Sequence, residues 1–130
     1  SRIFADHVFH QRASNILNHL VKSEELLCIS GQIVRELISV CSVSRFLSRA
    51  LSWDELRSQI DSILSQTELL NENKTSILKL IDLSSRYKVL GKQIHDANIV
   101  ATMLTHGVTQ LITFNPDDFK KFKEIKVIIP

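Results

Sequence analysis

The stretch Gly91–Phe119, GKQIHDANIVATMLTHGVTQLITFNPDDF, decides the fold of this chain. Its first part has apolar residues at the spacing that gives a helix one apolar face, namely Ala97, Val100, Ala101 and Leu104. His106 falls in the last turn of this helix, and Gly107 just beyond it is the usual stop signal. The β-prone run Gln110–Phe114 follows and ends at a turn dipeptide. A helix leading through a short turn into a strand is half of an α/β repeat, so the stretch predicts an α/β fold.

Acidic and amide side chains occur at both ends of this unit. Asp96 lies in the first turn of the predicted helix, where a carboxylate suits the exposed N–H groups. Asn115, Asp117 and Asp118 directly follow the predicted strand. The functional crevice of an open parallel sheet lies outside the carboxyl ends of its strands, which is where these side chains are expected to gather. Carboxylates in such a crevice indicate a hard divalent cation such as Mg²⁺.

The rest of the chain continues the alternation of helices and strands. A capping box, S-x-x-E, begins at Ser52. The apolar stripes predict inward faces of Trp53, Leu56, Ile60, Ile63 and Leu64 on one helix, and of Ile77, Leu78, Ile81 and Leu83 on another. We expect helices from Asp6 to about Lys22, over Gln32–Cys41, from Trp53 to about Gln66 and over Lys74–Tyr87, and strands at Leu26–Ile29, Thr67–Leu70 and Lys126–Ile129.

Glu36 lies one turn past the carboxyl end of the strand at Leu26–Ile29, which places a further acid on the same rim. Taken alone, this residue fits a solvated glutamate beside Arg35 equally well. The histidines His7 and His10 lie three residues apart and can share a helix face, but no carboxylate or cysteine lies near them in the sequence. Surface histidines are therefore favoured there over a metal site.

Composition limits the alternatives. A length of 130 residues predicts one domain, and a net charge of +2 with a pI near 8.6 permits a nucleic-acid partner without requiring one. Cys28 and Cys41 lie in apolar contexts without metal-ligand spacing to a histidine, so both are expected to be reduced and buried. No signal peptide and no membrane-spanning run appears, which predicts a soluble cytoplasmic protein.

Three segments of the chain resemble the PIN domain, in particular the stand-alone toxins of the VapC type: SGQIVREL from Ser30, the stretch Gly91–Phe119, and FKEIKVIIP from Phe122. The resemblance spans nearly the whole chain. It implies a single domain over residues 1–130 with a three-layer α/β/α architecture and a parallel sheet. It also implies an endoribonuclease that depends on Mg²⁺ or Mn²⁺ and serves as the toxin of a type II toxin–antitoxin system.

The resemblance assigns roles position by position. Glu36 matches the family's acid on the helix after the second strand, and Asp96 matches the acid of its HDA motif. Asp118 is the acid of the D-F pair, and these three are the expected catalytic metal ligands. The expected supporting residues are Thr113, Asn115 and Asp117. Phosphate contacts are expected from Arg45, Lys92 and Lys120, although the lysines around Lys120 also fit an ordinary solvated face.

One departure from the family pattern concerns the amino terminus. The family opens with a central strand that ends in an Asp, and Ser1–Ala5 is expected to align with the helix after that strand. On this alignment the central first strand and its Asp are absent, the domain is truncated relative to the family, and metal binding and cleavage are expected to be weak. Losing that strand would leave buried backbone groups without partners. Asp6 lies too far along the chain, on this alignment, to replace the missing acid.

The resemblance implies three partners: an RNA substrate, a cognate antitoxin that inserts a peptide across the acidic groove, and a second copy in a homodimer. The alternative function is a catalytically inactive interaction module that binds an antitoxin or RNA without cleaving it. A phosphoacceptor domain of the receiver type requires an Asp at the end of a strand, which neither LLCI nor QLITF supplies.

Overall fold

A five-stranded parallel sheet forms the centre of the computed structural model, which describes residues 1–6, 24–43 and 51–130. The strand order is β3-β2-β1-β4-β5, so β1 lies in the middle. All neighbouring strands run parallel. The strands are β1 (Arg2–Asp6), β2 (Leu26–Ser30), β3 (Thr67–Leu70), β4 (Gln110–Thr113) and β5 (Lys126–Ile128).

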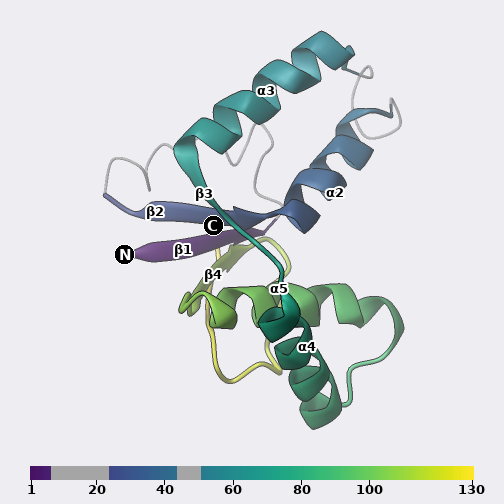
Figure 1. The fold of residues 1–130 in the computed structure, drawn as a ribbon, viewed down its shortest axis with the longest axis vertical. Helices are drawn as coiled ribbons and strands as arrows, with labels where there is room; N and C mark the ends of the chain where they lie inside the picture. The colour runs from purple at the N-terminus through teal and green to yellow at the C-terminus, as the bar shows by residue number, and fades with distance from the viewer. Residues whose placement is uncertain (7–23, 44–50) are drawn as a thin grey trace.

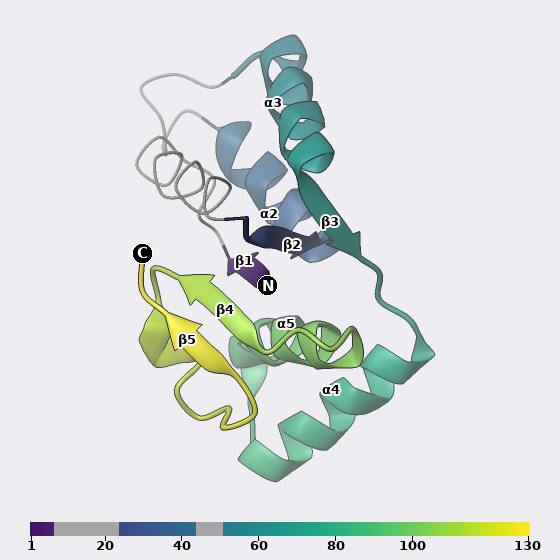
Figure 2. The same ribbon diagram turned by 90° about the vertical axis from the view of Figure 1, so that its left-hand side faces the viewer.

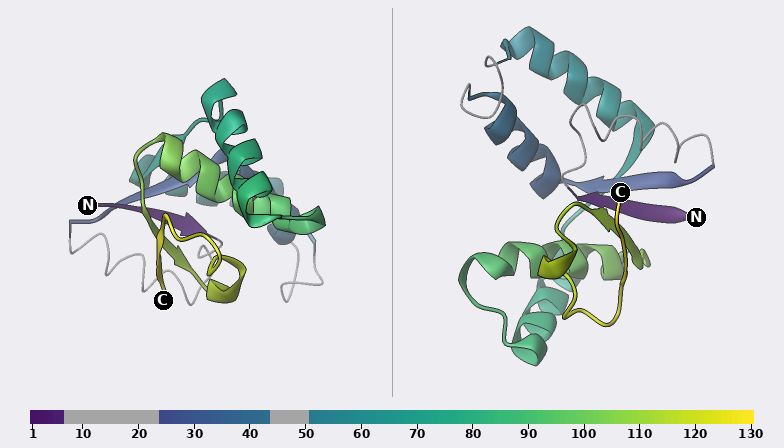
Figure 3. Two further views of the ribbon diagram at one scale, coloured as in Figure 1. Left: turned by 90° about the horizontal axis from the view of Figure 1, so that it is seen from below. Right: turned by 180° about the vertical axis from the view of Figure 1, so that it is seen from behind.

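Helices cover the sheet from both sides. Helices α2 and α3 lie on one side of it, and α4 and α5 lie on the other (Figures 1 and 2). The view from behind in Figure 3 shows the same division. The predicted α/β/α architecture is therefore confirmed. The helices are α2 (Gly31–Cys41), α3 (Trp53–Gln66), α4 (Lys74–Tyr87) and α5 (Ile94–Thr105), with short 3-10 turns η2 (Gly91–Gln93) and η3 (Pro116–Asp118).

The prediction that the central first strand is absent from this chain is wrong. Residues Arg2–Asp6 form β1, which pairs with β2 through Phe4 and Cys28 and with β4 through Asp6 and Thr113. Asp6 is therefore the last residue of a central strand. The rest of the helix predicted up to Lys22, with His7 and His10, lies outside the described residues.

The remaining elements match the predicted ones closely. The capping box at Ser52 is present, and Asn73 caps α4 in the same reciprocal way. Ser30 occupies the N-cap position of α2 without donating or accepting a side-chain cap bond. Gly107 has a φ of +73°, a left-handed conformation that stops α5 and turns the chain towards β4. A short 3-10 turn, η3, follows β4, with Pro116 as its first residue.

Two predicted helix faces are only partly correct. On α3 only Leu56 of the predicted face is fully buried, and Trp53 is 68% exposed. On α4, Leu83 is buried as expected, whereas the predicted core residues Ile77, Leu78 and Ile81 are 53%, 57% and 60% exposed. The face of α4 that carries Ile77, Leu78 and Ile81 is therefore not the face that packs against α5. An apolar stripe predicts a helix better than it predicts what covers that helix.

The core lies between the sheet and α5. Helix α5 is buried along most of its length because it packs on the sheet and on α4, and this fixes the position of its first turn. Cys28 and Cys41 are both buried and free, as predicted. Burial raises the pKa of each thiol. None of the helices described has the length and apolarity that a membrane span requires.

Candidate active site

The carboxyl end of β1 places Asp6 at the centre of the candidate site. Asp6 is 2% exposed, and its Oδ2 accepts a hydrogen bond of 2.8 Å from Thr113 Oγ1 on the neighbouring strand β4. Thr113 Oγ1 in turn accepts the backbone N–H of Asn115 at 3.0 Å. The N–H of Asn115 thus fixes the threonine hydroxyl so that its hydrogen points at the carboxylate. Thr113, expected from the resemblance to support the acids, therefore lies beside the carboxylate of Asp6.

Glu36 and Asp96 lie on helices that begin at the same edge of the sheet. Helix α2 starts directly after β2, and Glu36 lies in its second turn. Helix α5 leads through a turn into the start of β4, so its own first turn, with Asp96, lies at the opposite, carboxyl edge. Both side chains are half-buried. The fold therefore directs three acids from distant parts of the sequence, Asp6, Glu36 and Asp96, to one edge.

A side-chain amide joins the helices that carry two of these acids. Gln32, in the first turn of α2, donates from Nε2 to Glu36 Oε1 at 3.3 Å and to the backbone oxygen of His95 at 3.0 Å. Asn98 donates from Nδ2 to Gln32 Oε1 at 2.8 Å and to Glu72 Oε1 at 2.5 Å. Since His95 precedes Asp96, these contacts hold the first turns of α2 and α5 together.

The other predicted acidic residues, Asp117 and Asp118, are exposed. Asp118 ends η3 and is exposed, and within the described residues no hydrogen bond or ion pair joins it to Asp6, Glu36 or Asp96. Asp117 is also exposed and pairs with Lys120 Nζ at 2.5 Å. Asn115 has an exposed side chain, and its backbone contact to Thr113 is what ties it to the site.

The structure describes two of the three expected phosphate-binding residues, Lys92 and Lys120. Lys92 is exposed in η2, directly before the helix that carries Asp96. Lys120 is exposed beside η3 and already pairs with Asp117. Arg45 lies outside the described residues. Lys121, which belongs to the same group of lysines in the sequence, donates to Gln93 Oε1 at 2.9 Å and so links the segment after η3 to η2.

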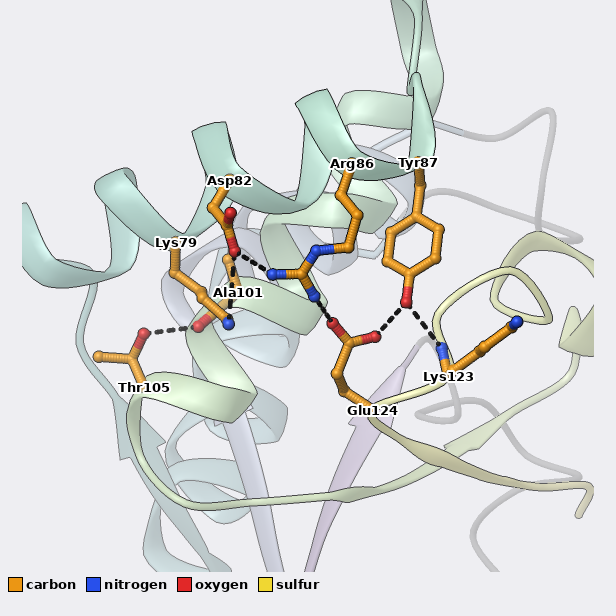
Figure 4. A network of polar contacts seen from close by, with 8 residues as sticks. All are labelled: Lys79, Asp82, Arg86, Tyr87, Ala101, Thr105, Lys123 and Glu124. Carbon is orange, nitrogen blue, oxygen red and sulfur yellow. Dashed lines mark hydrogen bonds and ion pairs between the residues drawn. The ribbon is translucent and has the colours of Figure 1, made fainter.

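A polar network fastens this segment to α4 (Figure 4). Glu124 accepts hydrogen bonds from Tyr87 at 2.5 Å and from Arg86 at 2.6 Å, and Arg86 also pairs with Asp82 at 2.7 Å. Burial alone would raise the pKa of Glu124, but the Tyr87 hydrogen bond and the charge of Arg86 outweigh burial and lower it. The network holds the chain between η3 and β5, and with it the neighbourhood of Asp118, against the body of the domain.

The donor set suits a divalent cation in its chemistry. Asp6 is almost fully buried and Glu36 also has a buried carboxylate oxygen, and burying carboxylates is favourable only when donors or a cation compensate. Carboxylate oxygens are the ligands that Mg²⁺ and Mn²⁺ take. Among the described residues, no group of three acidic, histidine or cysteine side chains is placed closely enough to hold an ion.

Sequence reasoning missed two parts of this arrangement, Asp6 and the amide pair Gln32 and Asn98. The sequence signal for Asp6 was the short apolar run Ile3–Ala5 directly before it, which is typical of a buried parallel strand. For Gln32 the signal was its position four residues before Glu36, on the same face of the helix. No local signal pointed to the contact with Asn98, which is 66 residues away in the sequence.

The family model of the PIN domain matches residues 1–125, a range that begins with β1 and includes every acid described above. The chain belongs to the PIN domain family. Sequence comparison with curated proteins gave no match.

Solved structures of toxin–antitoxin proteins share this PIN fold. VapBC2 from Rickettsia felis, bound to a promoter DNA fragment, is 18% identical with a TM-score of 0.73, and the match covers 100% of this chain and 99% of that one. VapBC-1 from nontypeable Haemophilus influenzae is 17% identical with a TM-score of 0.69, covering 99% and 98%. A toxin–antitoxin complex from Klebsiella pneumoniae is 21% identical with a TM-score of 0.67, covering 98% and 96%. At these identities the likeness establishes the fold.

Proposed function

We propose that this PIN domain is a divalent-metal-dependent endoribonuclease and the toxin of a toxin–antitoxin pair. The observation that carries the proposal is the buried carboxylate of Asp6 at the end of the central strand, with Glu36 and Asp96 directed to the same edge. PIN domains are generally nucleases, so membership of the family supports the same reading. With Asp6 in place, the expectation of weak cleavage by a domain lacking its first acid no longer applies.

Each side chain has a distinct part in the proposed reaction. Asp6, Glu36 and Asp96 hold Mg²⁺ or Mn²⁺, which when bound supplies Lewis acidity and neutralises charge on the phosphodiester. Thr113 orients Asp6 through its hydroxyl. Asp118, exposed at the end of η3, is proposed as an outer acid of the same edge, with Asn115 and Asp117 as supporting residues.

Exposed lysines bring the RNA backbone to these acids. Lys92 directly precedes the helix of Asp96, and Lys120 lies beside η3, so both can attract phosphates to the carboxyl edge. Arg45 is proposed for the same role from its place in the sequence. An RNA substrate would place the protein in the cytoplasm.

The test is cleavage of single-stranded RNA with Mg²⁺ or Mn²⁺. Asp6→Asn, Glu36→Gln and Asp96→Asn are each expected to lower the rate by at least about a hundredfold, because each removes a charge that stabilises the transition state. Asp61→Asn, at an exposed position on α3, is the matched control and should keep full activity. Cleavage that survives EDTA, or that the site variants retain, contradicts the proposal.

A second candidate function is an interaction module that binds an antitoxin or RNA at the same edge without cleaving it. The similarity of this chain in fold to a toxin–antitoxin complex supports this function. Stable co-purification with a small partner, together with no metal-dependent cleavage by any preparation, would favour this function.

The proposed protein partners are an antitoxin and a second copy of this chain. Structures related in fold are described as toxin–antitoxin complexes, which supports an antitoxin. The exposed apolar side chains Ile77, Leu78 and Ile81 on α4 form a surface of the kind that protein partners cover, which supports a homodimer. Light scattering of the isolated chain and of the chain co-expressed with its partner measures both assemblies.

A further inference from the structure

Gln32 is a buried polar residue whose amide is fully used. It is 5% exposed and lies in the first turn of α2, four residues before Glu36. Its two amide hydrogens go to Glu36 Oε1 and to the backbone oxygen of His95, and its oxygen accepts from Asn98. A buried side chain with this many partners is held in one position.

The contacts also fix which way the amide faces. The nitrogen of Asn98 has two hydrogens, one directed to Gln32 Oε1 and the other to Glu72 Oε1. Reversing the Gln32 amide would place its oxygen against Glu36 Oε1 and the oxygen of His95, and its nitrogen against the nitrogen of Asn98. Only the observed orientation pairs every donor with an acceptor. The N–H groups of Gln32 therefore point at the edge where Glu36 and Asp96 lie.

We infer that Gln32 is a positioning residue that sets the distance between Glu36 and Asp96 for a divalent cation, with Asn98 holding its amide in place. The inference rests on the proposed metal-dependent function. Gln32 holds one oxygen of Glu36 directly, and it holds the backbone immediately before Asp96. A change in this single side chain thus alters the placement of both acids.

Holding α2 against α5 does not by itself require a buried, hydrogen-bonded glutamine such as Gln32. Apolar side chains would hold α2 against α5 without the cost of burying an amide. Donors aimed at a carboxylate ligand are typical of the shell around metal ligands, and losing such a donor usually lowers metal affinity by about 10- to 100-fold. Gln32 is therefore expected to affect metal affinity beyond any effect on stability.

The experiment measures Mn²⁺ affinity by calorimetry, without RNA, together with the free energy of unfolding in EDTA. Gln32→Met keeps the length of the side chain and removes the amide, and it is expected to weaken Mn²⁺ binding by about tenfold. Gln110→Met is the matched control, because it removes an amide that donates to Ser1 Oγ at 2.9 Å at the opposite edge of the sheet. This control is expected to bind Mn²⁺ as the wild type does.

A second variant keeps the inference testable if Gln32→Met does not fold. Asn98→Ala leaves Gln32 in place but removes the donor that orients its amide, so it is expected to weaken Mn²⁺ binding relative to the wild type. Wild-type affinity in Asn98→Ala would overturn the inference. Where Gln32→Met folds, the double variant should bind as Gln32→Met alone, because both changes act through the same amide. Additive losses would show that the two residues act independently and would overturn the inference.

The outcomes separate this inference from the function on which it rests. If the wild type binds Mn²⁺, Glu36→Gln does not, and Gln32→Met binds like the wild type, Gln32 does not position the acids and the metal site stands. If the wild type itself binds no Mn²⁺, both the metal site and the role of Gln32 are overturned. A Gln32→Met variant that loses affinity while the control keeps it supports both.

Discussion

At the scale of single residues, the placement of Asp6 controls the site. Its carboxylate is buried at the end of a central strand, where water compensates its charge poorly. Thr113 donates to one oxygen, and the N–H of Asn115 holds the threonine in the orientation that makes this possible. These two hydrogen bonds hold the carboxylate of Asp6 in one orientation before any ligand binds.

Removing the hydroxyl of Thr113 tests this preparation. Thr113→Val keeps the shape of the side chain and takes away the donor, so the free energy of unfolding in EDTA should fall by about 2 kcal/mol. Mn²⁺ affinity should fall by about tenfold, as for other groups that orient metal ligands. Thr113→Ser retains the hydroxyl and is the control for the loss of a methyl group. Equal behaviour of the valine and serine variants, in urea unfolding and in calorimetry, would show that the hydroxyl does not matter.

The sequence could predict that Glu36 and Asp96 lie at the carboxyl edge of the sheet, because each lies near the start of a helix that has a clear local pattern, whereas Thr113 was expected only from the resemblance to the family. Asp6 could not be placed in the same way, since aspartate is equally suited to cap a helix. Asp6 is shown to end a strand only by the pairing of β1 with β2 and β4, which are distant from it in the sequence. The role of Gln32 likewise depends on His95, 63 residues away.

At the scale of elements, α4 and the segment before β5 form a unit held by Glu124. Tyr87 and Arg86 donate to its two carboxylate oxygens, and the ring of Tyr87 packs edge-on against Phe122 with centroids 5.4 Å apart. The pKa of Glu124 is lowered in the folded chain, so folding favours the ionised carboxylate over the protonated one. The unit is therefore sensitive to acid.

Glu124 stabilises the fold near neutral pH, and this contribution is lost in acid. A carboxyl group whose pKa is lowered by folding contributes stability above its unfolded pKa, about 4.3 for glutamate, and loses that contribution as the pH falls through its folded pKa. Tyr87→Phe removes a hydrogen bond to the charged group and should lower the free energy of unfolding by about 1.5 kcal/mol at pH 7. The difference from the wild type should shrink below about pH 4.

Urea unfolding over a range of pH measures this difference. Glu124→Gln is the companion variant, because it keeps the shape of the side chain and cannot ionise. Its stability should converge with that of the wild type in acid. A destabilisation by Tyr87→Phe that is the same at pH 7 and in acid would show that packing of the ring, rather than the charge of Glu124, holds the unit.

The sequence predicted the bounds of most elements because their signals are local, such as the capping box before α3 and the glycine after α5. It did not predict which helix face is covered. The apolar stripe of α4 is exposed in the isolated chain, whereas Leu83 on another part of the helix is buried. Which neighbour covers a stripe depends on the path of the whole chain.

At the scale of the whole molecule, the parallel sheet brings the acids to one edge. All strands run in the same direction, so every carboxyl end lies on one side and every following helix starts there. Asp6 ends β1, Glu36 lies on the helix after β2, and Asp96 lies in the first turn of α5, so three distant parts of the sequence reach this edge. A bound cation is expected to draw their carboxylates together.

Diffraction from crystals soaked in MnCl₂, with an anomalous difference map at the manganese edge, tests the central claim most directly. We expect a peak between the carboxylates of Asp6, Glu36 and Asp96 in the wild type, and its loss in crystals of Asp6→Asn. A map without a peak at this edge, or with manganese bound only elsewhere on the molecule, would contradict the account.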